Sequence, residues 1–159
     1  MRRERYLKTL RALAECYQTF ERVSAAHLRQ LGLTAPQFDI VATLGNTAGM
    51  TFKELGEKSL ITKGTLTGVV DRLEARGIVQ RIESPTDKRC TIVALTLVGQ
   101  QQFDAYFPKH IAFLKQPFDT LSEDASVKLE NVLWELQQGF QKIESKAGLA
   151  SVPNQSSGE

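Results

Sequence analysis

Residues 51–97 constrain the fold of this chain more than any other part of its sequence. Two short helical patterns lie here, separated by a tight turn near residue 60. Two runs rich in branched residues follow, at 78–82 and 91–95, and a polar loop joins them. Two helices around a turn, followed at once by a hairpin, predict a winged helix-turn-helix.

Capping residues mark the ends of these helices. Thr51 and Glu54 have the spacing of a capping box at the start of the first short helix, and Thr62 is the expected cap of the second. The second helix should end at Gly77, where a left-handed conformation is favoured. Its inward-facing residues are predicted to be Leu66, Val69, Val70 and Leu73.

Long amphipathic helices are predicted on both sides of this motif. Before it, apolar side chains recur every three or four residues from Tyr6 to about Leu31, and a second helix begins at a capping box, Thr34 to Gln37. After it, one helix contains Pro108, which should kink or break it, and a last helix begins at Ser122. The predicted fold is mainly α with a small β-hairpin wing.

The predicted elements divide the chain into four segments. These are an N-terminal dimerisation helix, a winged helix-turn-helix DNA-binding domain, C-terminal dimerisation helices and a disordered tail, at 1–33, 34–97, 98–145 and 146–159. The apolar stripes of the terminal helices exceed what one subunit covers, which favours a homodimer built from both ends of the chain. A monomeric bundle folded back on the winged domain is the alternative.

Composition excludes several classes of protein. The chain has 159 residues, 42% of them hydrophobic and 24% charged, and a net charge of +2, as is ordinary for a globular domain. No apolar run reaches the roughly 18 residues that span a membrane, and no signal peptide is seen, so a cytoplasmic protein is expected. The two cysteines and two histidines lack metal-ligand spacing, and no nucleophile lies beside a base. We expect no metal, no cofactor and no enzymatic activity.

The helix expected over 62–76 carries the groups suited to the DNA major groove. Small and hydroxylated side chains on its N-terminal face allow close approach to base edges. Two glycines inside a helix cost about 1 kcal/mol each relative to alanine, which favours a face that must stay thin. The alternative is that these glycines admit a neighbouring helix. The candidate residues are Thr62, Lys63, Gly64, Thr65, Thr67, Gly68 and Arg72.

Other cations of the motif are candidates for contacts with the DNA backbone, which position a protein without reading sequence. Lys53 and Lys58 lie on the first short helix, and Arg76 lies at the end of the second. Solvated surface positions are the alternative for all three.

The hairpin tip is the sharpest functional feature. Arg89 at a tip can enter a narrow minor groove, where negative potential is concentrated. Asp87 can hold its guanidinium by a charge-assisted hydrogen bond. Lys88 and Ser84 are further phosphate candidates, and an ordinary solvated turn is the alternative.

Three stretches taken together resemble the MarR family of bacterial transcriptional regulators: LTAPQFDIVATL, TFKELGEKSLITKGTLTGVVDRLEARGIVQR and SPTDKRCTIVALT. The resemblance extends from Tyr6 to Ile143. It implies an obligate homodimer formed by the first and the last two helices, and a palindromic operator in double-stranded DNA. In the family an Asp-x-Arg pair acts at the wing, as Asp87 and Arg89 would here. Many members release DNA when a small, often phenolic or anionic, compound binds, and others respond to cysteine oxidation.

The residues beyond the motif indicate where an effector would bind. His27, Phe103, Tyr106 and Phe107 are candidates for a pocket that takes an aromatic or anionic compound, with helical core as the alternative. His110 is expected at the surface. Cys16 does not match the position of the family's reactive cysteine relative to Pro36, so a buried, inert thiol is favoured over a redox sensor; Cys90 is expected to pack at the start of a strand.

The sequence therefore predicts a dimeric, sequence-specific DNA-binding regulator, a repressor that leaves a palindromic operator when an effector binds. A winged-helix protein-interaction module without DNA binding is the first alternative, and Lys63, Lys88 and Arg89 count against it. A redox-responsive regulator that uses Cys16 is the second.

Overall fold

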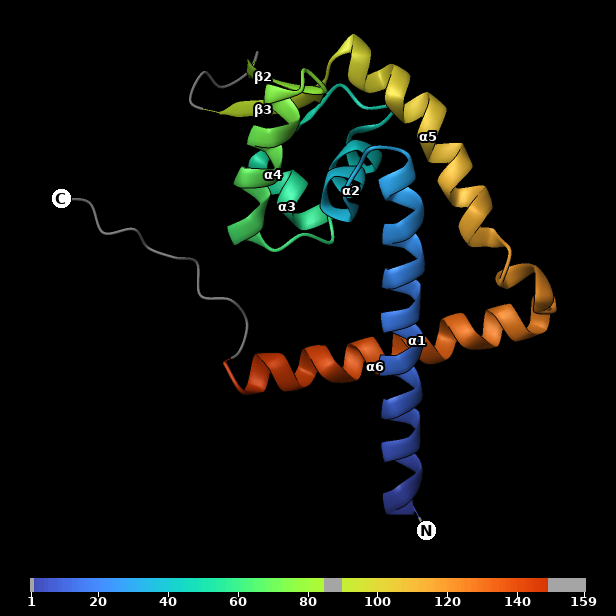
Figure 1. The fold of residues 1–159 in the computed structure, drawn as a ribbon. Helices are drawn as coiled ribbons and strands as arrows, with labels where there is room; N and C mark the ends of the chain where they lie inside the picture. Colours follow the sequence, from blue (N-terminus) through green and yellow to red (C-terminus); the bar gives the residue numbers. More distant parts are fainter. Residues whose placement is uncertain (1, 85–89, 149–159) are drawn as a thin grey trace. The chain divides into compact units, whose positions relative to one another are not determined.

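The computed structural model describes residues 2–84 and 90–148, with the side chains of 2–4 and 63 left out (Figure 1). The chain forms two compact units, Met1–Leu114 and Lys115–Glu159. The first unit contains α1 (Arg2–Gln30), α2 (Ala35–Leu44), β1 (Met50–Thr51), α3 (Phe52–Lys58), α4 (Lys63–Ala75), β2 (Val79–Glu83) and β3 (Thr91–Leu95), and α5 (Leu97–Lys115) runs to its end. The second unit contains η1 (Phe118–Thr120) and α6 (Glu123–Lys146).

The predicted fold class is confirmed: the described chain is mostly helical, with a small antiparallel sheet. Its strand order is β1-β3-β2, and β2 pairs with β3 from Val79↔Leu95 to Glu83↔Thr91. β3 has the predicted bounds, and β2 is shifted by one residue from the prediction. β1 was missed because two residues carry no alternating pattern.

The turn before β1 depends on a glycine. Gly49 has a φ of +104°, and a Cβ placed on it would lie 2.8 Å from the carbonyl oxygen of Val93. No residue with a side chain fits this approach without a shift of β3. Gly49 therefore lets the chain pass close enough for Met50 to pair with Val93.

The core of the first unit lies among α2, α3, α4 and the sheet. Its best-buried members, with at most 1% of their surface exposed, include Leu44, Leu55 and Leu73. The predicted inward face of α4 is confirmed, because Leu66, Val69, Val70 and Leu73 all belong to this cluster. Most of this core comes from the winged domain, and Leu33 and Phe103 of the flanking segments complete it.

Capping residues fix where the helices begin. Thr51 and Glu54 form the predicted capping box at α3, and the N–H and hydroxyl of Thr51 lower the pKa of the Glu54 carboxyl. The box predicted at Thr34 and Gln37 is also present. Thr62 stands at the N-cap position of α4, as predicted, but its side chain makes no capping hydrogen bond.

Of the kink or break expected at Pro108, the break does not occur in α5. The helix runs from Leu97 to Lys115 with Pro108 inside it. The missing N–H removes one intrahelical hydrogen bond. Buried side chains on both sides of the proline, Phe103 and His110, hold the helix to the rest of the unit.

The terminal helices leave much apolar surface exposed. On α1 only the last turns are buried, at Ser24 and Leu28, whereas Tyr6, Leu10, Tyr17 and Phe20 are 47–57% exposed. α6 begins at the predicted cap, since Ser122 Oγ accepts the N–H of Ala125 at 3.3 Å. It contains no buried residue. The segment predicted as a tail begins at Lys146, the last residue of α6, and its residues 149–159 lie outside the described part.

No helix in the described part of the chain combines the length and the apolar character that crossing a membrane requires.

Candidate nucleic-acid interface

Helices α3 and α4 with the hairpin β2–β3 form the winged helix-turn-helix, and α4 packs against β2 (Figure 1). The described residues of α4 that are proposed for DNA contact lie outside the buried leucine and valine positions of the helix. Thr65, Thr67 and Arg72 are exposed and Gly68 is partly exposed. The side chain of Lys63 is not among those described.

The two glycines of α4 face open space. A Cβ added to Gly64 or to Gly68 would meet no atom within 4 Å. The alternative that they admit a neighbouring helix is therefore not supported within the described chain. Their effect is to keep the N-terminal face of α4 thin.

Hydroxyl groups cluster at the start of α4. The Oγ1 atoms of Thr62 and Thr65 are hydrogen-bonded at 3.0 Å. Thr62 therefore presents its hydroxyl beside that of Thr65, on an exposed part of the helix. This arrangement leaves both hydroxyls available to a further hydrogen-bond partner.

The turn between α3 and α4 is held by a residue that sequence reasoning missed. Asp39 on α2 accepts the N–H of Leu60 at 2.7 Å. Burial raises the pKa of the Asp39 carboxyl, and this hydrogen bond opposes the rise. The side chain of Leu60 is 94% exposed. Asp39 thus fixes the path of the chain immediately before the helix that would read DNA.

The backbone candidates differ in their surroundings. Lys53 and Lys58 are exposed on α3. Arg76 donates to the carbonyl oxygen of Gly32 at 3.1 Å and to Gln37 Oε1 at 3.3 Å. Its guanidinium therefore ties the end of α4 to the start of α2, and its contact with DNA stays a prediction.

The described part of the wing reaches its base only. The N–H of Ser84 donates to the carbonyl oxygen of Cys90 at 3.0 Å, which closes the hairpin, and Ser84 is 7% exposed. Asp87, Lys88 and Arg89, the residues predicted at the tip, lie outside the described residues. Cys90 was expected to pack at the start of a strand; it directly precedes β3 but is exposed.

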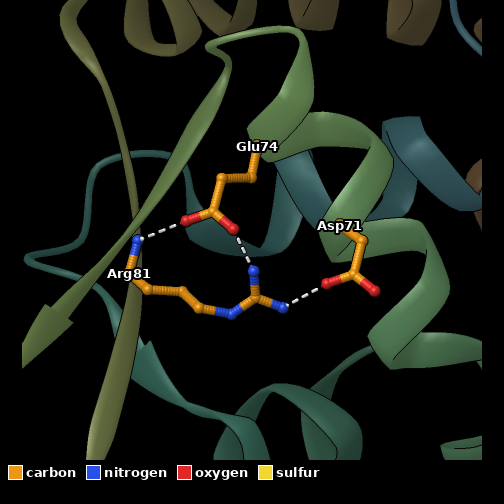
Figure 2. Close-up of polar contacts among 3 residues, drawn as sticks. All are labelled: Asp71, Glu74 and Arg81. Atoms are coloured by element: carbon orange, nitrogen blue, oxygen red, sulfur yellow. Dashed lines mark hydrogen bonds and ion pairs between the residues drawn. The ribbon is translucent and has the colours of Figure 1, made fainter.

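Arg81 on β2 joins the wing to α4 (Figure 2). Its guanidinium contacts Asp71 Oδ1 at 2.5 Å and also pairs with Glu74. Glu74 additionally accepts the backbone N–H of Arg81 at 3.2 Å. The hydrogen bond to Asp71, together with Glu74, raises the pKa of Arg81 above its ordinary value. We name these three residues the α4–wing clamp.

The clamp also reaches α3. The Cζ atom of Arg81 lies 5.4 Å from the centroid of the Phe52 ring, within the range of a cation–π contact. None of the four residues was singled out from the sequence. The spacing of Asp71 and Glu74 on one helical face was visible, but the partner on the strand was not.

The candidate effector residues form part of a histidine–aromatic cluster of α1, α2 and α5. His27 Nδ1 and His110 Nδ1 are 2.9 Å apart, so one nitrogen donates to the other. The His27 ring stacks on Phe113 with centroids 4.1 Å apart, and Phe38 meets His110 edge-on. The remaining candidates Phe103, Tyr106 and Phe107 lie in or against the core.

Two other expectations about single residues were wrong. His110 was expected at the surface and is 2% exposed, because its other nitrogen lies 3.2 Å from the hydroxyl of Ser24 and its ring packs among aromatic side chains. Burial and the neighbouring His27 lower the pKa of His110. Cys16 was expected to be buried and is exposed, because the N-terminal part of α1 packs little against its own chain.

Comparison with known proteins agrees with this arrangement. Residues 33–91 match the model of the MarR family. The HTH-type transcriptional regulator MhqR of Bacillus subtilis is 30% identical over 121 residues, which are 76% of this chain and 83% of that protein.

Two solved structures from Streptomyces coelicolor have the same fold. AbsC, a MarR family transcriptional regulator, gives a TM-score of 0.78 at 22% identity, over 86% of this chain and 94% of AbsC. Sco3205, a MarR family transcriptional regulator in complex with DNA, gives 0.77 at 25% identity, over 84% of this chain and 90% of its own.

Proposed function

Because this chain belongs to the MarR family of DNA-binding transcriptional regulators, we propose that it is a homodimeric repressor that binds a palindromic operator and is released by a small effector. The observation that carries the proposal is the outer face of α4, where two glycines and exposed threonines leave room for base edges. No catalytic role is proposed, since the family is one of regulators. The DNA-bound Sco3205 structure gives the precedent for this fold on DNA.

In the proposed complex α4 enters the major groove with its N-terminal half. The hydroxyls of Thr65 and Thr67 and the amine of Lys63 meet base edges, and Arg72 reaches a phosphate farther along. Gly64 and Gly68 set the depth, because a side chain at either position would hold the helix away from the bases. Lys53 and Lys58 contact the backbone from α3.

The wing makes the second contact. We assign Arg89 to the adjacent minor groove, with Asp87 holding its guanidinium and Lys88 on a phosphate. Ser84 is the least favoured of the wing candidates because its side chain is buried. Its role is then to shape the base of the hairpin.

A second copy of the chain completes the proposed DNA-binding assembly. The apolar side chains exposed on α1 and α6 need a partner, and a second copy supplies a matching apolar surface by symmetry. Two α4 helices would then lie about 34 Å apart, one turn of the duplex, which requires a palindromic site.

For release we propose the histidine–aromatic cluster. Rings from three helices meet there, and an aromatic compound can replace one of these ring contacts with a similar one. Its anionic group would meet the nitrogens of His27 and His110. Salicylate at millimolar concentration should then raise the melting temperature and weaken DNA binding, and His27→Ala should abolish both effects; no change in the wild type would reject this site.

Selection of genomic DNA fragments by the purified chain tests the function. We expect the wild type to enrich fragments that share one palindrome, and Arg89→Ala to enrich them weakly at the same salt concentration. Enrichment of no shared sequence would contradict DNA-specific function and favour a protein-interaction module. Equal enrichment by both would reject the role of the wing alone.

A further inference from the structure

Two carboxylates lie on the helix that is proposed to enter DNA. Asp71 and Glu74 are on one face of α4, and their side chains are 57% and 38% exposed. Negative charge on such a helix opposes its approach to phosphates. Because these two carboxylates would weaken DNA binding by their charge, we expect another role for them in their contacts.

The contacts of these carboxylates indicate what that role is. Both bind the guanidinium of Arg81, which extends from β2 across to α4 (Figure 2). Glu74 also accepts the backbone N–H of Arg81 at 3.2 Å, on β2, which is an edge strand of the sheet. The Glu74 carboxylate therefore binds both the side chain and the main chain of Arg81. It also accepts a backbone N–H at the edge of the sheet, where no further strand of the described chain pairs with β2.

Charged hydrogen bonds from a planar guanidinium to two fixed acceptors define an orientation as well as a distance. Phe52 of α3 lies against the same guanidinium. The α4–wing clamp thus sets the direction of the wing strand relative to both helices of the helix-turn-helix. Residues 85–89 follow β2 directly in the sequence, so the direction of β2 at Arg81 decides from where these residues start.

We propose that Arg81 is a positioning residue for DNA binding, which fixes the wing against α4 through Asp71 and Glu74 so that the major-groove and minor-groove contacts form together. This inference rests on the proposed function. It assigns to Arg81 no contact with DNA of its own.

Neutralising Asp71 and Glu74 tests the proposal, because the two explanations predict opposite changes in operator affinity. If the carboxylates act only by their charge, Asp71→Asn and Glu74→Gln remove repulsion and strengthen operator binding. If they position the wing, both weaken it: about three-fold for Asp71→Asn, which loses one partly exposed ion pair, and about ten-fold for Glu74→Gln, which loses two contacts. Glu15→Gln is the matched control, because it removes a carboxylate of similar exposure, 60%, from an ion pair on α1.

The second measurement is the coupling between Arg81 and Arg89 in operator affinity. A merely structural role of Arg81 would leave the effects of the two substitutions additive. Arg89→Ala should cost at least ten-fold in the wild type but less than about three-fold in an Arg81→Met background, since a misplaced tip contributes little. Arg81→Lys should restore part of the affinity. Melting temperatures show whether each variant is folded, and Asp71→Asn stays informative if Arg81→Met is not.

The outcomes separate this inference from the function on which it rests. Failure of the wild type to bind any specific operator contradicts the proposed function. Specific binding by the wild type, with tighter binding by both neutralised variants or with additive effects of Arg81→Met and Arg89→Ala, overturns only the positioning role. Weaker binding with non-additive effects supports it.

Discussion

The winged part of the chain and its last helix have similar apolar content but differ in how much of it is buried. In the winged part, Leu44, Leu55 and Leu73 are fully buried among side chains of the same chain. In α6, Leu133, Trp134 and Ile143 are 43–61% exposed, and no residue of the helix is buried. The first region is stabilised by a core that the same chain supplies, whereas the second presents an apolar face of the kind that a partner covers. The proposed dimer on two half-sites would use both properties.

The largest effect is expected at the exposed face of α6. Leu133→Asp places a charge in the proposed dimer interface twice, once from each copy, and should weaken the dimer about 1,000-fold. Light scattering over a range of concentrations measures the mass, which should fall from twice 17.7 kDa to that of one chain. Asn131→Asp, on the opposite face of the helix, is the control and should remain dimeric. A Leu133→Asp chain that stays a tight dimer would remove α6 from the interface.

A substitution in the winged core should act on folding instead. Leu44→Ala removes a side chain that is 0% exposed and should lower the free energy of unfolding by about 3 kcal/mol. Leu60→Ala makes the same chemical change at a side chain that is 94% exposed and should lower it by less than about 0.5 kcal/mol. Urea unfolding of both variants measures the contrast. Similar losses would mean that the winged core is less closed than its burial indicates.

Acidity should loosen the helices around His110. The folded chain lowers the pKa of His110, so below the ordinary pKa of 6.5 the unfolded chain binds a proton that the folded chain resists. Stability from this group is complete above pH 6.5 and is lost as the pH falls below it, by at most about 1.4 kcal/mol per pH unit. Urea unfolding at pH 7.5 and 5.5 measures the loss. His110→Gln should lose less over this interval, and an equal loss would place the titration elsewhere.

The smallest changes in stability are expected at two threonines that stand at the starts of helices. Thr51→Ala breaks the capping box of α3 and should cost about 1 kcal/mol of folding stability. Thr62→Ala removes a side chain that makes no capping hydrogen bond, so it should lower folding stability by only a few tenths of a kcal/mol. The same substitution should weaken operator binding. Thermal unfolding and DNA titration of the two variants give the answer. A stability loss at Thr62 as large as at Thr51 would show that the hydroxyl pair at α4 is structural.

Local signals in the sequence were sufficient for most of the fold. Capping boxes at Thr34 and Thr51 and the apolar period of α4 depend on residues within one or two turns, and each was predicted correctly. The hairpin followed from branched residues in the same way. The helix break considered at Pro108 is absent because packing on both sides of a proline is a tertiary property that the local pattern does not contain.

The site was less predictable because its contacts join distant segments. Arg81 meets Asp71 and Glu74 across a turn, and His27 meets His110 across 83 positions. Spacing in the sequence does not report such pairs. The exposed candidates on α4 came from residue type and from position in the expected helix, and their contacts with DNA stay predictions.

The number of chains on the operator tests the account most directly. Light scattering of the wild type on its selected palindrome, and on the same duplex with one half-site scrambled, measures the stoichiometry and the affinity together. We predict two chains on the intact duplex and an affinity at least about 100-fold lower on the scrambled one. One chain on the intact duplex, or equal affinity for both duplexes, would contradict a dimer that reads two half-sites with α4 and the wing.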